Sequence, residues 1–110
     1  MRGNPAPTKE SHTMSVLIVG NIAVENPASL AAYKVAAAAS MKEFGIGLVG
    51  QAAPTEMLEG KLDGIITVIL EAESAETARA WFASESYTKA IAARSEDARF
   101  TIAIVPRAGA

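Results

Sequence analysis

The sequence predicts an α+β protein of the ferredoxin-like βαββαβ type, in which a four-stranded antiparallel sheet carries its helices on one face. Three observations lead to this prediction. Four short segments are rich in β-branched and aliphatic residues, as strands are. Two longer segments have helical spacing and begin at residues that cap helices. The order in which these segments follow one another is that of a split βαβ fold.

The first strand is expected at Val16–Ala23, where aliphatic and β-branched residues end at a turn signal. Asn26 is a typical N-cap and Pro27 suits the first helical position. We therefore expect a helix that runs to about Phe44 and is ended by Gly45. Its apolar stripe would consist of Leu30, Tyr33, Ala37, Met41 and Phe44.

A weaker second strand is expected at Ile46–Ala52, because Gly47 and Gly50 interrupt it. Pro54 indicates a bend, after which Glu56–Glu59 is expected to become extended again. Glycine and proline weaken a central strand and are tolerated at an edge or a bulge. This segment is therefore predicted to form an edge of the sheet.

The second half of the chain supplies two strands around a broken helix. Strands are expected at Ile65–Glu71 and Phe100–Pro106. Ser74 would cap a helix that breaks and starts again at Ser84. A right-handed crossover makes strands one and two parallel, and strand three is expected to lie between them.

Three of the four strands are apolar on both faces, whereas a sheet with one wet face should alternate apolar and polar residues. The first strand carries Val16, Ile18 and Ile22 on one face and Leu17, Val19 and Ala23 on the other. Helices can cover only one face, and the other would leave a larger apolar patch than soluble monomers usually expose. We expect a homodimer joined through the sheet faces. The alternative is a monomer with scattered exposed aliphatic residues.

The composition excludes several classes of function. The 110 residues suit one domain, and the net charge of −2 with scattered basic residues argues against nucleic acid and anionic membrane partners. No apolar stretch is long enough to span a bilayer. The absence of cysteine and the single histidine argue against a thiol nucleophile or a metal site. We expect a soluble, cytoplasmic protein without a cofactor.

The domain is expected to cover residues 14–107. Residues 1–13 contain two prolines and no hydrophobic period, which indicates a disordered tail or a remnant of vector sequence. His12 falls in this tail, so we do not expect it to serve as a ligand or a general base.

Part of the second half resembles the signature of the DUF1330 family, in which a strand ending in Glu is followed by a Ser, an Ala-Arg-Ala-Trp helix and a Ser-Pro-Glu-Tyr segment. The residues that carry the resemblance are Glu71, Ser74, Ala78, Trp81, Ser84, Tyr87 and Arg94. The likeness covers about Met14 to Val105, including Ala32-Tyr33. The chain departs from the family at Ser84-Glu85-Ser86-Tyr87 and at Gln51-Ala52-Ala53, where Arg-Gly-Gly is common.

The resemblance implies a fold similar to dimeric α/β barrel proteins, a group that includes small monooxygenases, and it supports the homodimer. It implies no particular activity. Catalytic residues therefore cannot be assigned from it, and whether the protein is an enzyme stays open.

The candidate site is a cavity between the helices and the sheet that takes a small, mostly apolar molecule. Tyr33, Trp81 and Tyr87 would line it, and Asn21 or Glu71 would orient a polar group. Glu71 could act there as an acid or base if burial raised its pKa. The alternative for Glu71 is a strand-end ion pair with Arg107. For the aromatic residues it is simple core packing, in a non-catalytic module that only dimerises.

Overall fold

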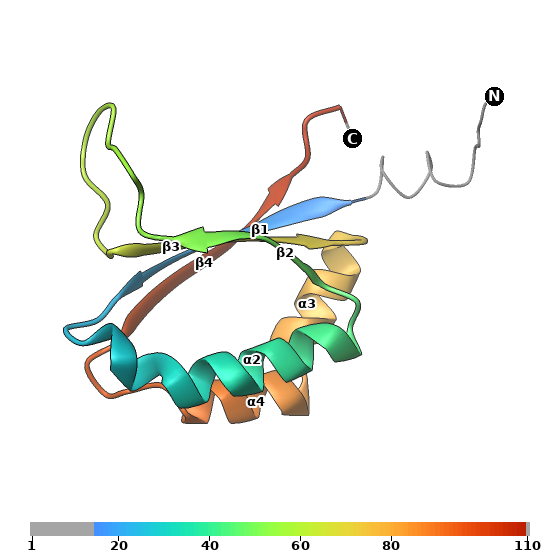
Figure 1. Ribbon diagram of the computed structural model, residues 1–110. Helices are drawn as coiled ribbons and strands as arrows, with labels where there is room; N and C mark the ends of the chain where they lie inside the picture. The colour runs from blue at the N-terminus through green and yellow to red at the C-terminus, as the bar shows by residue number, and fades with distance from the viewer. Residues whose placement is uncertain (1–14, 110) are drawn as a thin grey trace.

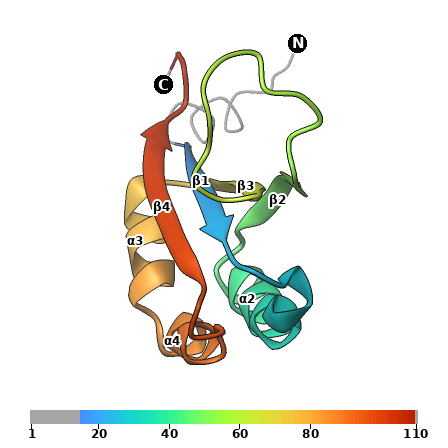
Figure 2. The ribbon, with the colours of Figure 1, turned by 90° about the vertical axis from the view of Figure 1, so that its left-hand side faces the viewer.

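The computed structural model describes residues 15–109 and consists of two layers, a sheet and a set of helices on one of its faces (Figures 1 and 2). The elements are β1 (Val16–Ala23), η1 (Pro27–Leu30), α2 (Ala31–Glu43), β2 (Gly47–Ala52), β3 (Ile66–Ala72), α3 (Ala75–Ala83), α4 (Glu85–Ala92) and β4 (Arg99–Pro106). The predicted tail at residues 1–13, with His12, lies outside the described residues. The predicted ferredoxin-like fold is confirmed.

The sheet has the strand order β2-β3-β1-β4, and all three neighbouring pairs are antiparallel. Strand β1 is central, and Gly20 on it is opposite Val68 of β3 and Ile102 of β4. Because β3 lies between β1 and β2, those two strands run parallel to each other without pairing. The predicted edge position of β2 is confirmed.

The first helical segment begins with a tighter turn than expected. Asn26 caps it as predicted, since its Oδ1 accepts a hydrogen bond from the Ala28 N–H at 3.1 Å. The turn η1 is a 3₁₀-helix that places Leu30 in the interior, and the α-helix starts only at Ala31. Gly45, with a φ of 67°, ends the segment.

The expectation that Glu56–Glu59 is extended is wrong. Strand β2 ends at Ala52, and the chain then makes a loop that projects from the sheet on the side away from the helices (Figure 1). The loop has no neighbouring strand with which to pair, so nothing holds it extended. A register shift between Leu48 and Gly50 marks a bulge in β2.

The second helical segment is divided by two serine caps, as predicted. The Ser74 Oγ accepts a hydrogen bond from the Thr77 N–H, and the Ser84 Oγ accepts one from the Tyr87 N–H, both at 3.1 Å. The break at Ser84 redirects the chain, so that α4 packs alongside α2 while α3 lies against β1 and β3. The helical layer therefore closes over one face of the sheet (Figure 2).

The two faces of the sheet are covered differently. Ile18 and Ile22 of β1 point toward the helices and are buried, whereas Leu17 and Val19 point to the other face and are partly exposed. We call this second side the outer face, and no helix of residues 15–109 lies on it (Figures 1 and 2). Within residues 15–109, none of the helices combines the length and apolar character needed to cross a bilayer.

Candidate functional site

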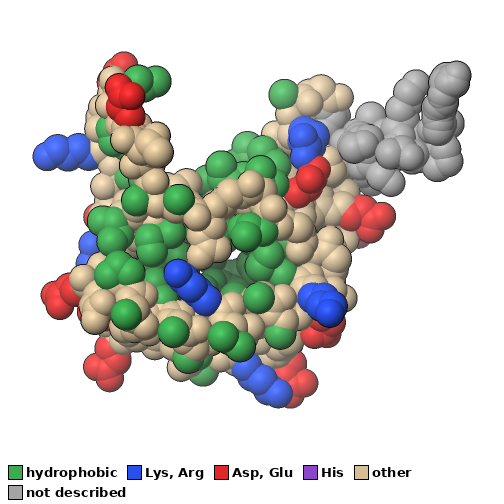
Figure 3. Space-filling view, viewed as in Figure 1, with side chains coloured by type: hydrophobic (Ala, Val, Ile, Leu, Met, Phe, Trp, Pro, Cys, Tyr) green, Lys and Arg blue, Asp and Glu red, His purple; other side chains and the backbone are tan. Residues whose placement is uncertain are grey.

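A cavity of about 420 Å³ lies between α2 and the helix-facing side of the sheet. Figure 3 shows the hollow framed by hydrophobic side chains, with a Lys or Arg side chain beside it. All four strands and the helices α2, α3 and α4 contribute to its wall. The floor is aliphatic and includes Ile18, Ile22, Val68, Leu70 and Ile102. An apolar molecule that enters this cavity would lose contact with water on most sides.

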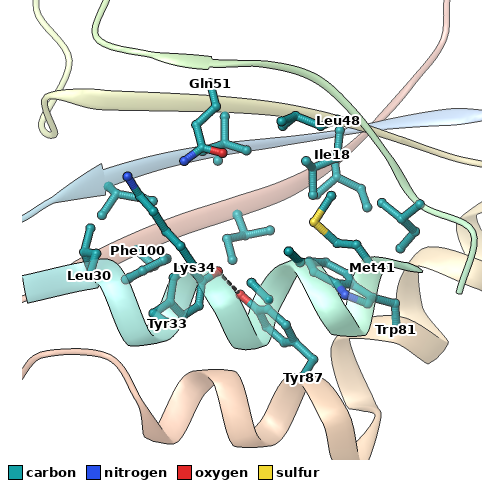
Figure 4. Close-up of a pocket in the computed structure, with 18 of the residues that line it drawn as sticks. Ile18, Leu30, Tyr33, Lys34, Met41, Leu48, Gln51, Trp81, Tyr87 and Phe100 are labelled. Carbon is teal, nitrogen blue, oxygen red and sulfur yellow. Dashed lines mark hydrogen bonds between the residues drawn. The ribbon is translucent and has the colours of Figure 1, made fainter. Parts of the chain in front are cut away.

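Aromatic side chains form the wall opposite the aliphatic floor (Figure 4). The ring centroids of Trp81 and Tyr87 are 4.3 Å apart, and those of Tyr33 and Phe100 are 4.9 Å apart. The Trp81 indole Nε1 donates a hydrogen bond to the Ser40 Oγ at 2.9 Å. This bond satisfies the buried indole N–H and fixes the ring at the side of the cavity.

A partly buried polar cluster interrupts the aromatic wall. The hydroxyl oxygens of Tyr33 and Tyr87 are 2.6 Å apart, and the Arg94 Nη2 donates to the Tyr87 Oη at 3.0 Å. The Arg94 guanidinium lies over the Phe100 ring, 3.7 Å from its centroid. This is a cation–π contact, in which the ring face attracts the positive charge.

The environment of Tyr33 determines its protonation. Burial raises the pKa of Tyr33 well above its usual value, and the hydrogen bond with Tyr87 raises it further, while Arg94 has a smaller opposite effect. The hydroxyl is therefore protonated at neutral pH. It can donate a hydrogen bond to a molecule in the cavity but cannot act there as a general base.

The mouth of the cavity carries positive charge. Lys34 and Lys42 of α2 and Gln51 of β2 line it and are exposed to solvent. Figure 4 shows Lys34 reaching up from α2 toward the side chain of Gln51. No Asp or Glu is among the described residues that line the cavity.

The structure brings together three of the five residues that the sequence suggested. Tyr33, Trp81 and Tyr87 all line the cavity. Asn21 and Glu71 do not, because each belongs to the strand positions that point to the outer face. Side chains of a strand alternate between the faces, and here the odd-numbered positions of β1 and β3 point away from the helices.

The outer-face positions of Asn21 and Glu71 have structural partners instead. The Asn21 Oδ1 accepts a hydrogen bond from the Gly64 N–H at 2.6 Å, and its Nδ2 donates to the carbonyls of Gly64 and Ile66. Glu71 forms an ion pair with Arg107, which confirms the expected strand-end pair. Glu71 is therefore not an acid or base of this cavity.

Sequence reasoning did not place Arg94, Phe100 or Gln51 in the site. The sequence could have indicated Arg94, because it follows Tyr87 by seven residues, and this spacing places two residues on the same side of a helix. Phe100 and Gln51 had none, because their positions depend on strand register and on the bulge in β2. Among residues 15–109, no three His, Cys, Asp or Glu side chains gather closely enough to hold a metal ion.

The chain belongs to the DUF1330 family, described as a domain of unknown function, whose family model matches residues 15–108. A comparison with curated proteins returned no match.

The solved structures with a similar fold include those of the following two proteins. One is RPA0582 of Rhodopseudomonas palustris, a protein of unknown function, with a TM-score of 0.61 and 16% identity over 92% of this chain and 93% of that one. Its methylated form gives a TM-score of 0.62 and 17% identity over 97% and 96%. The other is SnoaB of Streptomyces nogalater, described as a cofactor-independent oxygenase, with a TM-score of 0.64 and 15% identity over 88% and 96%. At these identities the likeness concerns the fold alone.

Proposed function

We propose that this protein binds a small, mostly apolar molecule in the cavity between α2 and the sheet, and that it does so as a homodimer joined through the outer faces. The single observation that carries the proposal is the cavity itself. Its volume of about 420 Å³ falls within the range of ligand sites, and its wall is apolar with a few polar groups that converge on it.

The volume limits the size of the ligand. A cavity of about 150 Å³ holds one benzene molecule, so by proportion this one suits a molecule of about 15 to 20 non-hydrogen atoms. Two or three fused rings together with their substituents have that size. The aromatic wall favours a planar molecule, because rings stack edge to face or offset at separations such as those of Trp81 and Tyr87.

Binding is better supported than acid–base conversion of the ligand. No carboxylate, imidazole or thiol is among the described residues that line the cavity. Tyr33, which also lines the cavity, stays protonated because burial raises its pKa. Cofactor-independent oxygenation, the activity of SnoaB, would need in this cavity a proton acceptor other than a carboxylate, an imidazole or Tyr33.

The homodimer rests on the outer face. Leu17, Val19, Ile69, Ala103 and Val105 share this face with Asn21 and Glu71, and no helix covers it (Figure 2). Val105 is 40% exposed at the edge of this surface. A second copy that packs its own outer face here would remove a continuous apolar surface from water, which is favourable in proportion to its area.

Two variants of α2 test the ligand site. Ala38 lines the cavity and the neighbouring Ala39 does not, although both are exposed. Phenylalanine at position 38 should obstruct the mouth, and Ala39→Phe is the matched control. The probe is 1-methoxy-4-nitronaphthalene, and the measurement is thermal unfolding followed by circular dichroism.

At ten times its Kd, the probe should raise the unfolding temperature of the wild type and of Ala39→Phe by about 5 °C or more. It should have little effect on Ala38→Phe. Equal shifts in all three proteins would place the binding elsewhere. No shift in any of them would favour the module that only dimerises.

The dimer has its own test. Val19 lies at the centre of the outer face, opposite Ile69 and Ala103 on the neighbouring strands. In a dimer of Val19→Lys, the lysines of the two copies would be buried in the interface without partners of opposite charge. Light scattering at micromolar concentration should therefore give the mass of a dimer for the wild type and of a monomer for the variant. Val35→Lys, on the exposed side of α2, is the control and should stay dimeric. A wild type with the mass of one chain would overturn this part of the proposal.

A further inference from the structure

Arg94 places a positive charge behind the aromatic wall without an acidic partner. The ion pairs among the described residues are Arg99 with Asp63 and Arg107 with Glu71, so Arg94 is in neither. Its Nη2 bonds Tyr87, and its Nε is buried without a hydrogen-bond partner. Arg94 as a whole is partly buried, so its charge has lost part of its hydration, and stacking on aromatic rings offsets only part of that cost. A negative charge close to this cluster would therefore be favoured.

One hydroxyl proton of the cluster has no acceptor within the cluster. Tyr87 accepts a hydrogen bond from Arg94, and each tyrosine has a single hydroxyl proton. Only one of these two protons can occupy the bond between the two hydroxyls. Tyr87 is fully buried, whereas Tyr33 is partly exposed on the cavity side. With Tyr87 as donor to Tyr33, the free proton is that of Tyr33, and it is available to a molecule in the cavity.

The charges around the cavity all have the same sign. Lys34 and Lys42 face it from α2, and Arg94 stands behind Tyr33 and Tyr87. The lining residues from the four strands and from α3 are uncharged, with Gln51 as the polar one. Solvent screens the two exposed lysines, whereas the partly buried Arg94 acts more strongly than a charge in water.

We infer that the Tyr33 hydroxyl, oriented by Tyr87 and Arg94, donates a hydrogen bond to an ionised ligand oxygen, so that the cavity selects acidic phenols and enols over their neutral analogues. This inference rests on the proposed ligand site. Tyr33 would be the residue that touches the ligand, and Tyr87 and Arg94 would be positioning residues. Chains of hydrogen bonds that end on a cation polarise one another, which strengthens the last donor.

A matched pair of probes tests the inference. 4-Nitro-1-naphthol ionises to a coloured anion, and its methyl ether, 1-methoxy-4-nitronaphthalene, has nearly the same shape and cannot ionise. The wild type should bind the anion about tenfold or more tightly than the ether, the gain expected from one hydrogen bond to a charged group. The absorbance titration of the bound naphthol should accordingly move to lower pH by about one unit or more.

Variants assign the effect to the cluster. Tyr33→Phe keeps the ring and removes the donor, and Tyr87→Phe breaks the connection to Arg94. Both should bring the affinity for the anion down to about that for the ether and return the absorbance titration to its position in buffer, while the ether still binds. Arg94→Met should do the same, and the matched Arg79→Met, on the exposed side of α3, should keep the wild-type preference. Thermal unfolding without probe checks that each variant is folded, and Tyr33→Phe carries the test if Arg94→Met is not.

The outcomes separate this inference from the proposed function. Equal affinity of the wild type for anion and ether, or a preference that survives Tyr33→Phe, overturns the inference and leaves the ligand site intact. Failure of both probes to bind the wild type overturns both proposals.

Discussion

Both faces of the sheet carry large aliphatic residues, and yet the helix side contains a cavity while no helix of residues 15–109 covers the outer face. On the helix side, Ile18, Ile22 and Leu70 are nearly fully buried beneath α2, α3 and α4. On the outer face, Leu17, Val19 and Ile69 are partly exposed beside two polar residues, Asn21 and Glu71. The position of the helices, rather than the composition of the strands, therefore decides which face is buried.

The two faces of the sheet also differ in where their polar side chains lie. On the cavity side, the polar groups away from the mouth are the cluster of Tyr33, Tyr87 and Arg94 and the bond from Trp81 to Ser40. The outer face holds polar groups at its ends, where Asn21 and Glu71 secure the chain that enters and leaves the sheet. Polar groups on the cavity side lie where the proposed ligand would meet them, and those on the outer face hold the backbone at Gly64 and the strand end at Arg107.

The largest expected effect is on the helix side. Trp81→Ala removes a side chain that is 3% exposed and should lower the free energy of unfolding by about 3 to 5 kcal/mol. The neighbouring Phe82 is 46% exposed, so Phe82→Ala should cost about 1 kcal/mol. Urea unfolding followed by circular dichroism measures both. Equal losses would mean that Trp81 is not the buried member of this pair.

The next effect is on the outer face. Asn21→Ala leaves the Gly64 N–H, in a buried residue, without its side-chain acceptor and should lower the free energy of unfolding by about 1 to 3 kcal/mol. Thr101→Ala, the exposed position opposite Asn21 on β4, is the control and should change it by about 0.5 kcal/mol or less. Hydrogen exchange at the Gly64 amide should speed up only in the Asn21 variant. An unchanged exchange rate there would show that the asparagine does not hold this loop.

A pH dependence should come from the cavity side. Because the pKa of Tyr33 is raised on folding, its contribution to stability is complete below pH 10, the ordinary tyrosine value, and is lost as pH rises above it. The decline can reach at most about 1.4 kcal/mol per pH unit. Urea unfolding from pH 9 to 11 should show a steeper decline for the wild type than for Tyr33→Phe. Parallel curves would contradict the buried environment of this hydroxyl.

The smallest effect is expected at the strand-end ion pair of the outer face. The side chains of Glu71 and Arg107 are 39% and 36% exposed, so Glu71→Gln should lower the free energy of unfolding by about 0 to 1 kcal/mol, and less at high salt. The more exposed Asp63 of the second pair gives the control Asp63→Asn, with an effect close to zero. A loss as large as that of Asn21→Ala would mean that Glu71 is more buried in solution than it is in the structure of one chain, as it would be in a dimer interface.

Most of the fold was predictable because local signals agreed with one another. Ser74, Ser84 and Asn26 each cap the segment they were expected to cap, and Gly45 ends the first helix. The extended segment predicted at residues 56–59 failed because an extended conformation needs a neighbouring strand, and the sheet edge offers none there.

The candidate site was predictable only in its helical part. Helical spacing placed Tyr33, Trp81 and Tyr87 on the side that faces the sheet. For the strands, the face that meets the helices could not be chosen, since both faces of β1 carry large aliphatic residues. Asn21 and Glu71 were therefore assigned to a cavity from which the strand alternation excludes them.

The most direct test of the ligand cavity uses Trp81, the only tryptophan of the chain and a residue of the cavity wall. Its fluorescence is followed while 1-methoxy-4-nitronaphthalene, an absorbing nitroaromatic, is added to the wild type, Ala38→Phe and Ala39→Phe. The account predicts saturable quenching in the wild type and in Ala39→Phe, with a much weaker response in Ala38→Phe. Quenching that rises linearly with concentration and is the same in all three proteins would be collisional, and it would contradict a ligand site between α2 and the sheet.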